Sequence, residues 1–417
     1  MPIRLTFIFL LLLATIWDCH AQIPGFFMKE EKRKVSIPFL SSNSLIIITV
    51  AINGNTPINF LVDTGVRSNI LFSKKLGDAL GLEYTRRIKL VGADGTDDLM
   101  ASVSPINHFD LGPVEGKLQS LLVLEEDFFE LESVIGVPVY GILGYEFFKY
   151  NPVKIDYEEG VLDFFEPKAM KWKPLFYRKW KMEIEDSKPY IRAKVKQIEG
   201  RTLEPKLLID TGANHGLLLN RETTDEIKMP PENIEAELGQ SLGGVLYGFV
   251  GRVDYLKFAN FKMEDVLTSY PEETAFSYVI ISSGRQGSLG AEVLGRTKLI
   301  FDYPRNRLLV AKADNFYQPF EYDMSGIVLK KVPNEDNRMY VSSLRKGSPA
   351  DYAGIKPFDE IMSINSVPTF IWELSEVTKL LRSEDGKEIK LEIRRYEGDD
   401  LTKWDDFTTS FTLKKQI

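Results

Sequence analysis

The tripeptide Asp-Thr-Gly occurs twice in this sequence, at residues 63–65 and 210–212, each time directly after a run of apolar residues. Two carboxylates that meet in one cleft can share a single proton, so that one is a base while the other is an acid at the same pH. Hydrolysis of a peptide bond without a metal needs both roles, because water must lose a proton and the carbonyl oxygen must gain one. The candidate catalytic residues are therefore Asp63 and Asp210.

Further matches in register indicate that the doubled motif belongs to an internal repeat. The pattern Gly-x-Leu-Gly-x-Glu occurs at 141–146 and at 287–292, and Asp156-Tyr157 is matched by Asp302-Tyr303. The three pairs are 147 (63 to 210), 146 (141 to 287) and 146 (156 to 302) residues apart. A nearly constant offset of this kind indicates two copies of one fold unit.

The elements around each motif are predicted to be short and rich in strands. Runs of β-branched and aromatic residues between turn residues predict strands at 44–50, 59–62, 70–72 and 118–124 in the first copy, and at 190–195, 205–209 and 298–303 in the second. Helical spacing over 73–82 predicts a short helix with Ser73 as its N-cap. Residues 166–181 are rich in Lys, Trp and Pro, which indicates a linker with aromatic anchors.

Composition restricts the partners and cofactors. The chain has 417 residues, of which 52 are basic and 60 acidic, for a net charge of -8, and it has no basic patch. We therefore expect no nucleic-acid partner. Beyond the N-terminal segment only His108 and His215 remain as histidines, and their spacing is not that of metal ligands. We expect no metal and no cofactor.

Residues 1–21 have the pattern of a secretory signal peptide. Arg4 supplies the positive start, residues 7–17 form an apolar stretch too short to span a bilayer, and Cys19-His20-Ala21 is a plausible cleavage site. We expect an exported protein, periplasmic or extracellular, with an uncleaved membrane anchor and a lipoprotein as the alternatives. No later apolar run is long enough for a transmembrane helix, so no stable membrane span is expected.

After residue 315 the sequence changes character and resembles the PDZ domains that are attached to bacterial proteases. Residues 347–350 read Gly-Ser-Pro-Ala, 353–355 read Ala-Gly-Ile, and 359–365 read Asp-Glu-Ile-Met-Ser-Ile-Asn. The pattern normally has glycine where Phe358 and Ser366 stand, which predicts altered turns. A longer helix is expected at 372–382, with late strands at 388–395 and 411–414. The loop of Ser325, Gly326 and Ile327 is the candidate cradle for the terminal carboxylate of a peptide ligand.

Apolar-apolar-Asp-Thr-Gly followed by Gly-x-Leu-Gly resembles the retropepsin-like aspartyl proteases of bacteria, twice over within residues 35–311. The resemblance implies a mainly β fold, in which duplicated acid-protease lobes form a two-lobed pseudo-dimer that is followed by an α+β PDZ-like domain. We expect a signal peptide at 1–21, lobe 1 at 22–166, lobe 2 at 167–315 and the PDZ-like domain at 316–417. The resemblance also implies that Thr64 and Thr211 hydrogen-bond across a two-fold axis, while Gly65 and Gly212 let backbone amides approach the carboxylates.

A protease of this type needs a hairpin flap that closes over the substrate. The flap candidates are Gly92 and Gly95 in the first copy and Gly243, Gly244 and Tyr247 in the second, and plain surface hairpins are the alternative. Pepsin-like enzymes carry a hydroxyl that bonds to the carboxylate at the positions of Val66 and Ala213. Its loss raises the pKa of the pair, so we expect a pH optimum less acidic than that of pepsin.

The expected function is that of an exported aspartic endopeptidase acting on extended polypeptides. Because both lobes lie in one chain, we expect a monomer. Two alternatives stay open: a non-catalytic peptide-binding protein built on a protease fold plus PDZ, and a protease that is active only as a homodimer. The tail could bind a C-terminal peptide, restrain the cleft, or only pack against the lobes.

Overall fold

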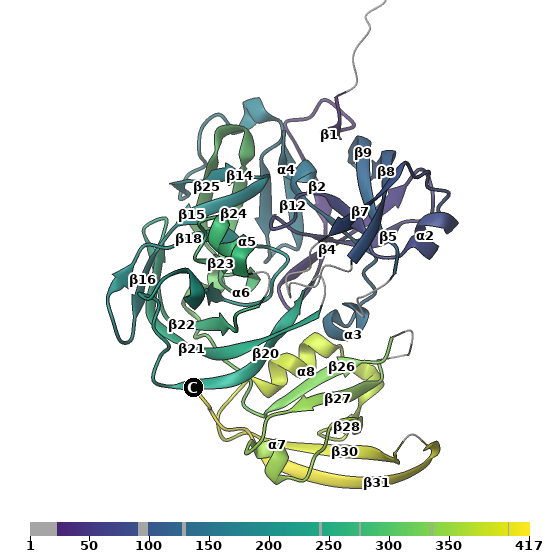
Figure 1. Ribbon diagram of the computed structural model, residues 1–417, viewed down its shortest axis with the longest axis vertical. Coiled ribbons are helices and arrows are strands. Elements are labelled where there is room, and N and C mark those ends of the chain that lie inside the picture. The colour runs from purple at the N-terminus through teal and green to yellow at the C-terminus, as the bar shows by residue number, and fades with distance from the viewer. Residues whose placement is uncertain are drawn as a thin grey trace, which may run out of the picture.

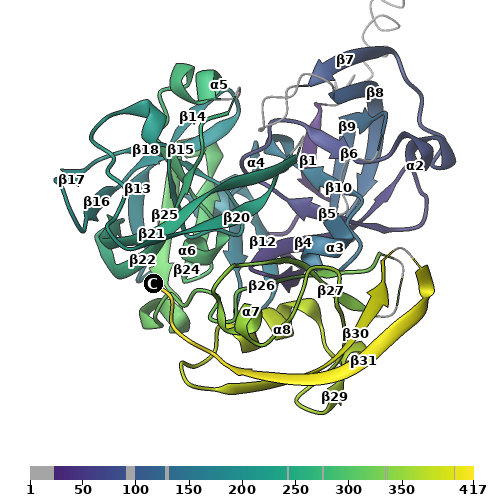
Figure 2. The same ribbon diagram turned by 60° about the horizontal axis from the view of Figure 1, so that its bottom comes forward.

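The computed structural model describes residues 23–90, 99–126, 131–241, 244–274, 277–333, 335, 337–398 and 400–417. Strands dominate these residues and form four sheets. Two β-rich lobes lie next to each other, and the C-terminal domain packs against both of them (Figure 1, Figure 2). This architecture confirms the prediction of a mainly β, duplicated fold with a separate C-terminal domain.

Lobe 1 is built on a nine-stranded sheet. Its strands, in spatial order, are β1 (Gly25–Met28), β9 (Val114–Leu124), β6 (Asn69–Leu71), β10 (Gly141–Leu143), β5 (Ile58–Val62), β4 (Leu45–Ile52), β8 (Leu99–Asp110) and β7 (Arg86–Leu90), with β3 (Leu40–Ser42) beside β4. Three short helices accompany the sheet: α2 (Lys74–Ala79), α3 (Leu131–Ile135) and α4 (Tyr145–Phe148). The predicted N-cap is confirmed, because Ser73 Oγ accepts a hydrogen bond from the Leu76 amide at 3.2 Å.

Lobe 2 repeats this plan on a ten-stranded sheet. The order is β14 (Glu183–Glu185), β15 (Lys188–Arg192), β18 (Lys206–Ile209), β23 (Gly287–Leu289), β19 (Leu217–Leu219), β22 (Phe261–Pro271), β21 (Gly244–Phe258), β16 (Lys194–Gln197) and β17 (Thr202–Leu203), with β20 (Asn233–Ser241) beside β21. Its helices are α5 (Ser277–Ser282) and α6 (Ala291–Leu294), with one-turn 3-10 helices η2 (Arg221–Thr223), η3 (Tyr303–Arg305) and η4 (Asp314–Tyr317).

A six-stranded sheet joins the two lobes. Lobe 1 contributes β2 (Lys34–Pro38), β12 (Val161–Phe165) and β11 (Val153–Asp156), and lobe 2 contributes β24 (Thr297–Asp302), β25 (Arg307–Lys312) and β13 (Arg178–Lys181). The lobes meet at the antiparallel β11–β24 pair, where Val153 lies opposite Phe301. Aromatic rings pack across this junction, with the centroids of Phe148 and Phe301 5.5 Å apart. The shared sheet and core therefore fix one lobe against the other.

The predicted linker at 166–181 holds one aromatic anchor but not the other. It contains η1 (Pro167–Met170) and ends in β13. Trp180 donates its indole N–H to the Arg192 carbonyl at 3.1 Å, as an anchor would. Trp172, by contrast, is 80% exposed.

The C-terminal domain has its own sheet and its own core. Its strands are β26 (Ile327–Lys331), β27 (Met339–Leu344), β28 (Glu360–Ile364), β30 (Glu388–Glu397) and β31 (Asp400–Thr412), with β29 (Val367–Pro368) beside β28, and its helices are α7 (Pro349–Tyr352), η5 (Thr369–Ile371) and α8 (Leu374–Leu381). The strand predicted at 411–414 is the end of the much longer β31. Its polar first half lacks an apolar pattern and is held as a strand by pairing with β30.

The two positions without the usual glycine keep left-handed turns. Phe358 has φ 71° and Ser366 has φ 67°, the region that glycine favours. The prediction that these turns are altered is therefore wrong. The surrounding strands hold both residues in a conformation that costs an L-residue roughly 1–2 kcal/mol.

Side-chain contacts hold the C-terminal domain against both lobes. The Arg252 guanidinium of lobe 2 donates to the Phe320 carbonyl at 2.8 Å and to the Ile417 carbonyl at 3.3 Å, so it holds both ends of the domain. Towards lobe 1, Lys331 Nζ lies 3.5 Å from Glu132 Oε1 of α3. Both lobes therefore share one contact surface with β26 and α8 (Figure 1).

Candidate active site

The two Asp-Thr-Gly loops occupy equivalent places at the ends of β5 and β18. Each aspartate directly follows its strand, and its amide bonds to the adjacent Gly-x-Leu-Gly segment, from Asp63 to the Leu143 carbonyl and from Asp210 to the Leu289 carbonyl, both at 2.9 Å. Parallel pairing of β5 with β10 and of β18 with β23 sets this contact. In each lobe, the strand that leads into Asp-Thr-Gly and the strand of the Gly-x-Leu-Gly motif are therefore neighbours in the sheet.

The structure brings Asp63 and Asp210 together within one chain. A Cβ added at Gly65 would lie 3.0 Å from Asp210 Cγ, and one at Gly212 would overlap the Asp63 carboxyl. Each carboxylate therefore lies against the glycine of the opposite loop, and the two carboxyls are in hydrogen-bonding reach of each other. The Gly65 amide donates to Asp63 Oδ1 at 2.6 Å and the Gly212 amide to Asp210 Oδ1 at 3.1 Å.

A reciprocal hydrogen-bond network of threonines locks the two loops. Thr211 Oγ1 accepts from the Thr64 amide at 3.1 Å, and Thr64 Oγ1 accepts from the Thr211 amide at 3.2 Å. Each hydroxyl also donates across the interface, from Thr64 to the Ile209 carbonyl at 2.7 Å and from Thr211 to the Val62 carbonyl at 2.9 Å. Both threonines are fully buried. Only a hydroxyl can donate and accept at once in this way.

The electrostatics of the pair favour one shared proton. Burial raises the pKa of Asp63 well above its usual value, and the neighbouring charge of Asp210 raises it further. The Gly65 amide and the Lys188 ammonium act in the opposite direction. Val66 offers no hydroxyl to the carboxylates, and its carbonyl accepts from the Tyr145 amide at 3.0 Å. One carboxyl can therefore act as an acid while the other acts as a base.

The flap candidates of lobe 2 lie on a long hairpin. Strands β20 and β21 pair up to Ser241 opposite Gly244, and the exposed Tyr247 lies opposite Glu237. In both views this hairpin reaches from lobe 2 towards lobe 1 (Figure 1, Figure 2). Gly243 lies outside the described residues, as do Gly92 and Gly95 between β7 and β8.

The histidines do not join the aspartates in a metal site. His215 Nε2 lies 2.9 Å from Ser288 Oγ, and burial lowers the pKa of its ring. His108 Nε2 lies 3.2 Å from Glu115 Oε2 at the surface of lobe 1. Among the residues that the structure describes, no cluster of three metal-ligating side chains occurs.

The predicted cradle of the C-terminal domain is already filled by a carboxylate of this chain. The amides of Ser325 and Gly326 donate to the two carboxylate oxygens of Asp323 at 3.1 and 2.6 Å. The Ile327 amide donates to Ser325 Oγ at 3.0 Å, and this hydroxyl donates to Asp323 at 2.6 Å. Two of the three amides therefore bind the Asp323 carboxylate, and the third binds the Ser325 hydroxyl.

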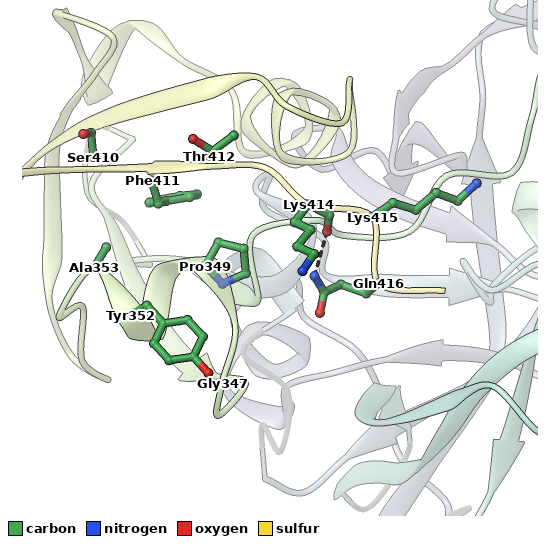
Figure 3. Close-up of a pocket in the computed structure, with 10 residues that line it drawn as sticks. All are labelled: Gly347, Pro349, Tyr352, Ala353, Ser410, Phe411, Thr412, Lys414, Lys415 and Gln416. Atoms are coloured by element: carbon green, nitrogen blue, oxygen red, sulfur yellow. Dashed lines mark hydrogen bonds between the residues drawn. The ribbon is translucent and has the colours of Figure 1, made fainter.

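A surface pocket of the C-terminal domain lies elsewhere. It is bordered by α7 and the end of β31, with Tyr352 on one side and Phe411 and Lys414 on the other (Figure 3). None of the predicted site residues lines it.

Sequence reasoning missed two cations that lie near the carboxylates. Lys188 and Arg285 are partly buried in lobe 2, and the charge of Asp210 acts on both of them. The internal repeat is the sequence signal that could have identified these two cations. Once the two copies are aligned strand by strand, these cations stand where lobe 1 has apolar residues.

Comparison with known proteins places each part of the chain. The aspartyl protease family model matches residues 48–147 and 194–293, and the PDZ domain model matches residues 340–395. The PDZ match begins after β26 and lies entirely within the C-terminal domain.

Among curated proteins, the chain is 33% identical over 84 residues to the carboxy-terminal processing protease CtpA of Bacillus subtilis, covering 20% of this chain and 18% of that protein. It is 32% identical over 79 residues to a probable CtpA-like serine protease of Staphylococcus haemolyticus, covering 18% and 16%. The chain thus spans less than a fifth of the length of these two relatives. Among solved structures, an aspartic proteinase from Irpex lacteus aligns with a TM-score of 0.42 at 12% identity, over 67% of this chain and 98% of that one.

Proposed function

Two segments of this chain belong to the aspartyl protease family and a third is a PDZ domain, and from this premise we propose that the protein is an aspartic endopeptidase. Asp63 and Asp210 are its proposed catalytic residues, and extended polypeptides are its proposed substrates. The observation that carries the proposal is the contact of the two carboxyls across the threonine network.

In the proposed reaction, a water molecule held between Asp63 and Asp210 attacks the carbonyl carbon of the scissile bond. The ionised carboxylate takes a proton from the water, and the protonated carboxyl gives its proton to the carbonyl oxygen. Collapse of the tetrahedral intermediate breaks the C–N bond: the leaving nitrogen gains the proton that the base had taken, and one hydroxyl of the intermediate returns its proton to the carboxylate that had acted as the acid. Thr64 and Thr211 keep the two carboxyls aligned, so the pair does not need to reorganise during the reaction.

A serine mechanism is the competing assignment, because one curated relative is described as a probable serine protease. Residues 239–243 match the spacing Gly-x-Ser-x-Gly of a serine nucleophile. Ser241, however, ends β20 and pairs with Gly244 of β21, whereas a nucleophile elbow joins a strand to a helix. Ser288, next to His215, is 7% exposed inside β23 between two paired strands. These placements favour the aspartate pair.

Inhibition of peptide cleavage tests the catalytic type. We expect pepstatin to block cleavage of an unstructured protein and a fluorophosphonate to leave it unchanged. Asp63→Asn and Asp210→Asn should each reduce kcat by about a hundredfold or more. If each variant keeps about half the activity, the pair is not shared and activity as a homodimer is favoured over the proposed monomer. Peptide binding without cleavage by the wild-type protein would favour the non-catalytic alternative.

We further propose that the PDZ domain restrains the cleft. Lys330 of β26 lies with its Nζ 3.9 Å from Glu237 Oε1 on the flap strand β20, and the neighbouring Lys331 faces lobe 1. A Cβ added at Gly136, after α3, would lie 2.9 Å from Leu374 Cβ at the start of α8. The edge of β26 and the start of α8 are thus in contact with the protease lobes. A C-terminal peptide ligand would have to displace Asp323 as well.

Charge reversal at the flap contact tests this restraint. We expect Lys330→Glu to change KM for a protein substrate, and the added change Glu237→Lys to restore it, because the double variant re-forms the ion pair. Equal effects of the single and double variants would contradict the proposal.

Export and the domain limits are part of the same proposal. Residues 1–21 are proposed as a signal peptide, followed by lobe 1 at 22–166, lobe 2 at 167–315 and the PDZ domain at 316–417. In the part of the chain that the structure describes, no helix has the length and apolar character needed to cross a membrane. N-terminal sequencing of the protein recovered from an expression host, with cleavage after Ala21, tests the assignment.

A further inference from the structure

The surroundings of the two aspartates are equivalent in backbone but differ in side-chain chemistry. Beside the first aspartate, Ile47 of β4 lies opposite Leu61 of β5. Because the two strands are antiparallel, the same register places Leu45, two residues before Ile47, opposite Asp63, two residues after Leu61. Beside the second aspartate, Tyr190 of β15 lies opposite Leu208 of β18, and the same step places Lys188 opposite Asp210. Directly opposed residues on paired strands project to the same face. Lys188 therefore lies on the face that carries Asp210.

The hairpins that carry these residues have the same turn. Asn43 and Ser44, between β3 and β4, have φ angles of 49° and 64°, and Asp186 and Ser187, between β14 and β15, have φ angles of 47° and 68°. Both pairs fit a two-residue turn with left-handed central residues. Leu45 and Lys188 each follow this turn directly, so their equivalence is structural.

A second equivalence relates Val139 to Arg285. Each lies two residues before the glycine that opens the strand next to the aspartate loop, β10 in lobe 1 and β23 in lobe 2. The residues that follow Val139 and Arg285 form equivalent backbone hydrogen bonds. The Tyr140 amide donates to the Asn59 carbonyl at 2.9 Å, and the Gln286 amide donates to the Lys206 carbonyl at 2.8 Å. Arg285 thus takes the place of Val139.

Lobe 1 has an apolar cluster at these positions and lobe 2 has polar residues. Leu45 and Val139 are 6% and 8% exposed, and they belong to one buried apolar cluster with Ile47, Phe72 and Ile142. The corresponding pairs, lobe 1 first, are Leu45 and Lys188, Ile47 and Tyr190, Phe72 and Asn220, Val139 and Arg285, and Ile142 and Ser288. These five apolar side chains of lobe 1 are replaced by residues with polar groups, whereas Leu61 and Ile70 of the same cluster correspond to Leu208 and Leu218, which stay apolar.

The charges of Asp63, Asp186 and Asp210 act on Lys188, and those of Asp210 and Glu222 act on Arg285, but none of these acids pairs with either cation in a salt bridge among the described residues. Among the described residues neither Lys188 nor Arg285 forms a salt bridge, whereas Lys206 of the same sheet lies 2.6 Å from Glu185 and 4.5 Å from the Tyr190 ring centre. Burial lowers the pKa of Lys188, and the charge of Arg285 lowers it further, while Asp210 and Asp63 raise it. Two partly buried cations that repel each other would be stabilised by an incoming carboxylate.

We propose that Lys188 and Arg285 form a carboxylate-binding subsite on the lobe 2 side of the cleft. The substrate is then a peptide with a carboxylate on the lobe 2 side of the scissile bond. Arg285 can bind both oxygens of a carboxylate, and Lys188 adds a point charge next to the reacting bond. This subsite rests on the proposed peptidase function, since the aspartate pair marks the position of the scissile bond.

The experiment compares peptides that differ only in charge. Amidated peptides carry Glu, Gln or Lys at successive positions on each side of one scissile bond, and kcat/KM is measured for each. We expect the Glu peptide to exceed its Gln counterpart by about tenfold at one position, as one hydrogen-bonded charge predicts. A matching Gln peptide with a free C-terminal carboxylate distinguishes a chain end from a side chain as the preferred source. A Glu to Gln ratio near one at every position, with no gain from a free C-terminus, overturns the proposal.

Variants assign the preference to the two cations. Lys188→Met and Arg285→Met should each bring the Glu to Gln ratio towards one, while Lys257→Met, on the exposed side of β21, should leave it at about ten. The ratio is the readout because the Lys188 charge also acts on Asp63, which changes cleavage of both peptides alike. A ratio that stays unchanged in both cleft variants overturns the subsite.

A binding measurement separates this proposal from the catalytic one. In full-length Asp63→Asn protein, calorimetry of the Glu and Gln peptides should give affinities that differ about tenfold, and the difference should be lost when Arg285→Met is added. If the wild-type protein cleaves no peptide but this difference is present, the subsite stands and the peptidase proposal fails. If peptides are cleaved but neither affinity nor rate depends on charge, the subsite fails alone.

Discussion

Replacing Thr64 with valine removes one hydroxyl from the network that locks the two Asp-Thr-Gly loops. Valine has nearly the shape of threonine, so the change deletes hydrogen bonds without opening a large cavity. The Thr64 hydroxyl donates to the Ile209 carbonyl at 2.7 Å and accepts from the Thr211 amide at 3.2 Å. Both threonines are completely buried, so water cannot take the place of the lost hydroxyl.

The expected cost follows from the two backbone groups that lose their partner. A buried polar group without a hydrogen bond costs about 1–3 kcal/mol, so Thr64→Val should lower the free energy of unfolding by about 2–6 kcal/mol. Thr64→Ser keeps both hydrogen bonds and removes one methyl group, for a cost of about 1 kcal/mol. Thr211→Val should match Thr64→Val, because the network is symmetric.

Urea unfolding and peptide cleavage measured together form the assay. The control is Thr268→Val in lobe 2, since Thr268 is also fully buried and donates to the Val266 carbonyl at 3.0 Å, outside the two catalytic loops. Thr268→Val should lose stability but keep kcat, whereas Thr64→Val should lose both. If Thr64→Val costs no more stability than Thr64→Ser, or lowers kcat no more than Thr268→Val, the reasoning on the threonine network is refuted.

Three further predictions concern proton binding, backbone conformation and the PDZ cradle. Because burial raises the pKa of Asp63, the folded protein binds this proton more tightly than the unfolded chain, and stability falls as pH rises above 3.8 towards the folded pKa. Asp63→Asn removes this loss, so its gain in thermal stability over wild type should grow with pH through that window, and a gain that is constant with pH would contradict the shift. Phe358→Gly should raise the free energy of unfolding by roughly 1 kcal/mol, because Phe358 is exposed and glycine adopts its φ of 71° without strain. The control Phe370→Gly in η5 should lower the free energy of unfolding by about 0.5–1 kcal/mol. Losses of similar size in both variants would count against strain at Phe358. Asp323→Ala should lower stability by about 1–3 kcal/mol and give the cradle about tenfold higher affinity for a peptide with a free C-terminus than for its amide, measured by fluorescence polarisation; equal affinities would exclude these amides as a carboxylate site.

Local patterns predicted the elements that depend on neighbours in the chain. The strand at 59–62, the N-cap at Ser73 and the helix within 372–382 follow from side-chain periodicity and capping chemistry, which act over a few residues. The strand β31 was predicted only at its end, because its first half is held by pairing with β30 and not by an apolar pattern of its own. Phe358 was expected to change its turn, but the packed strands on either side keep the glycine conformation.

The sequence by itself determined that the fold is duplicated and which residues could form the aspartate pair, because repeated motifs at a constant offset must occupy equivalent places in two equivalent lobes. Only the tertiary structure decided how the rest of the site is built. The threonine hydrogen bonds join residues 147 positions apart, the Gly326 amide binds the Asp323 carboxylate, and β15, which begins at Lys188, pairs with β18, which leads into Asp210. Such contacts depend on strand register and on packing between lobes, which local sequence patterns do not encode. The same register places Lys188 in lobe 2 where lobe 1 has Leu45.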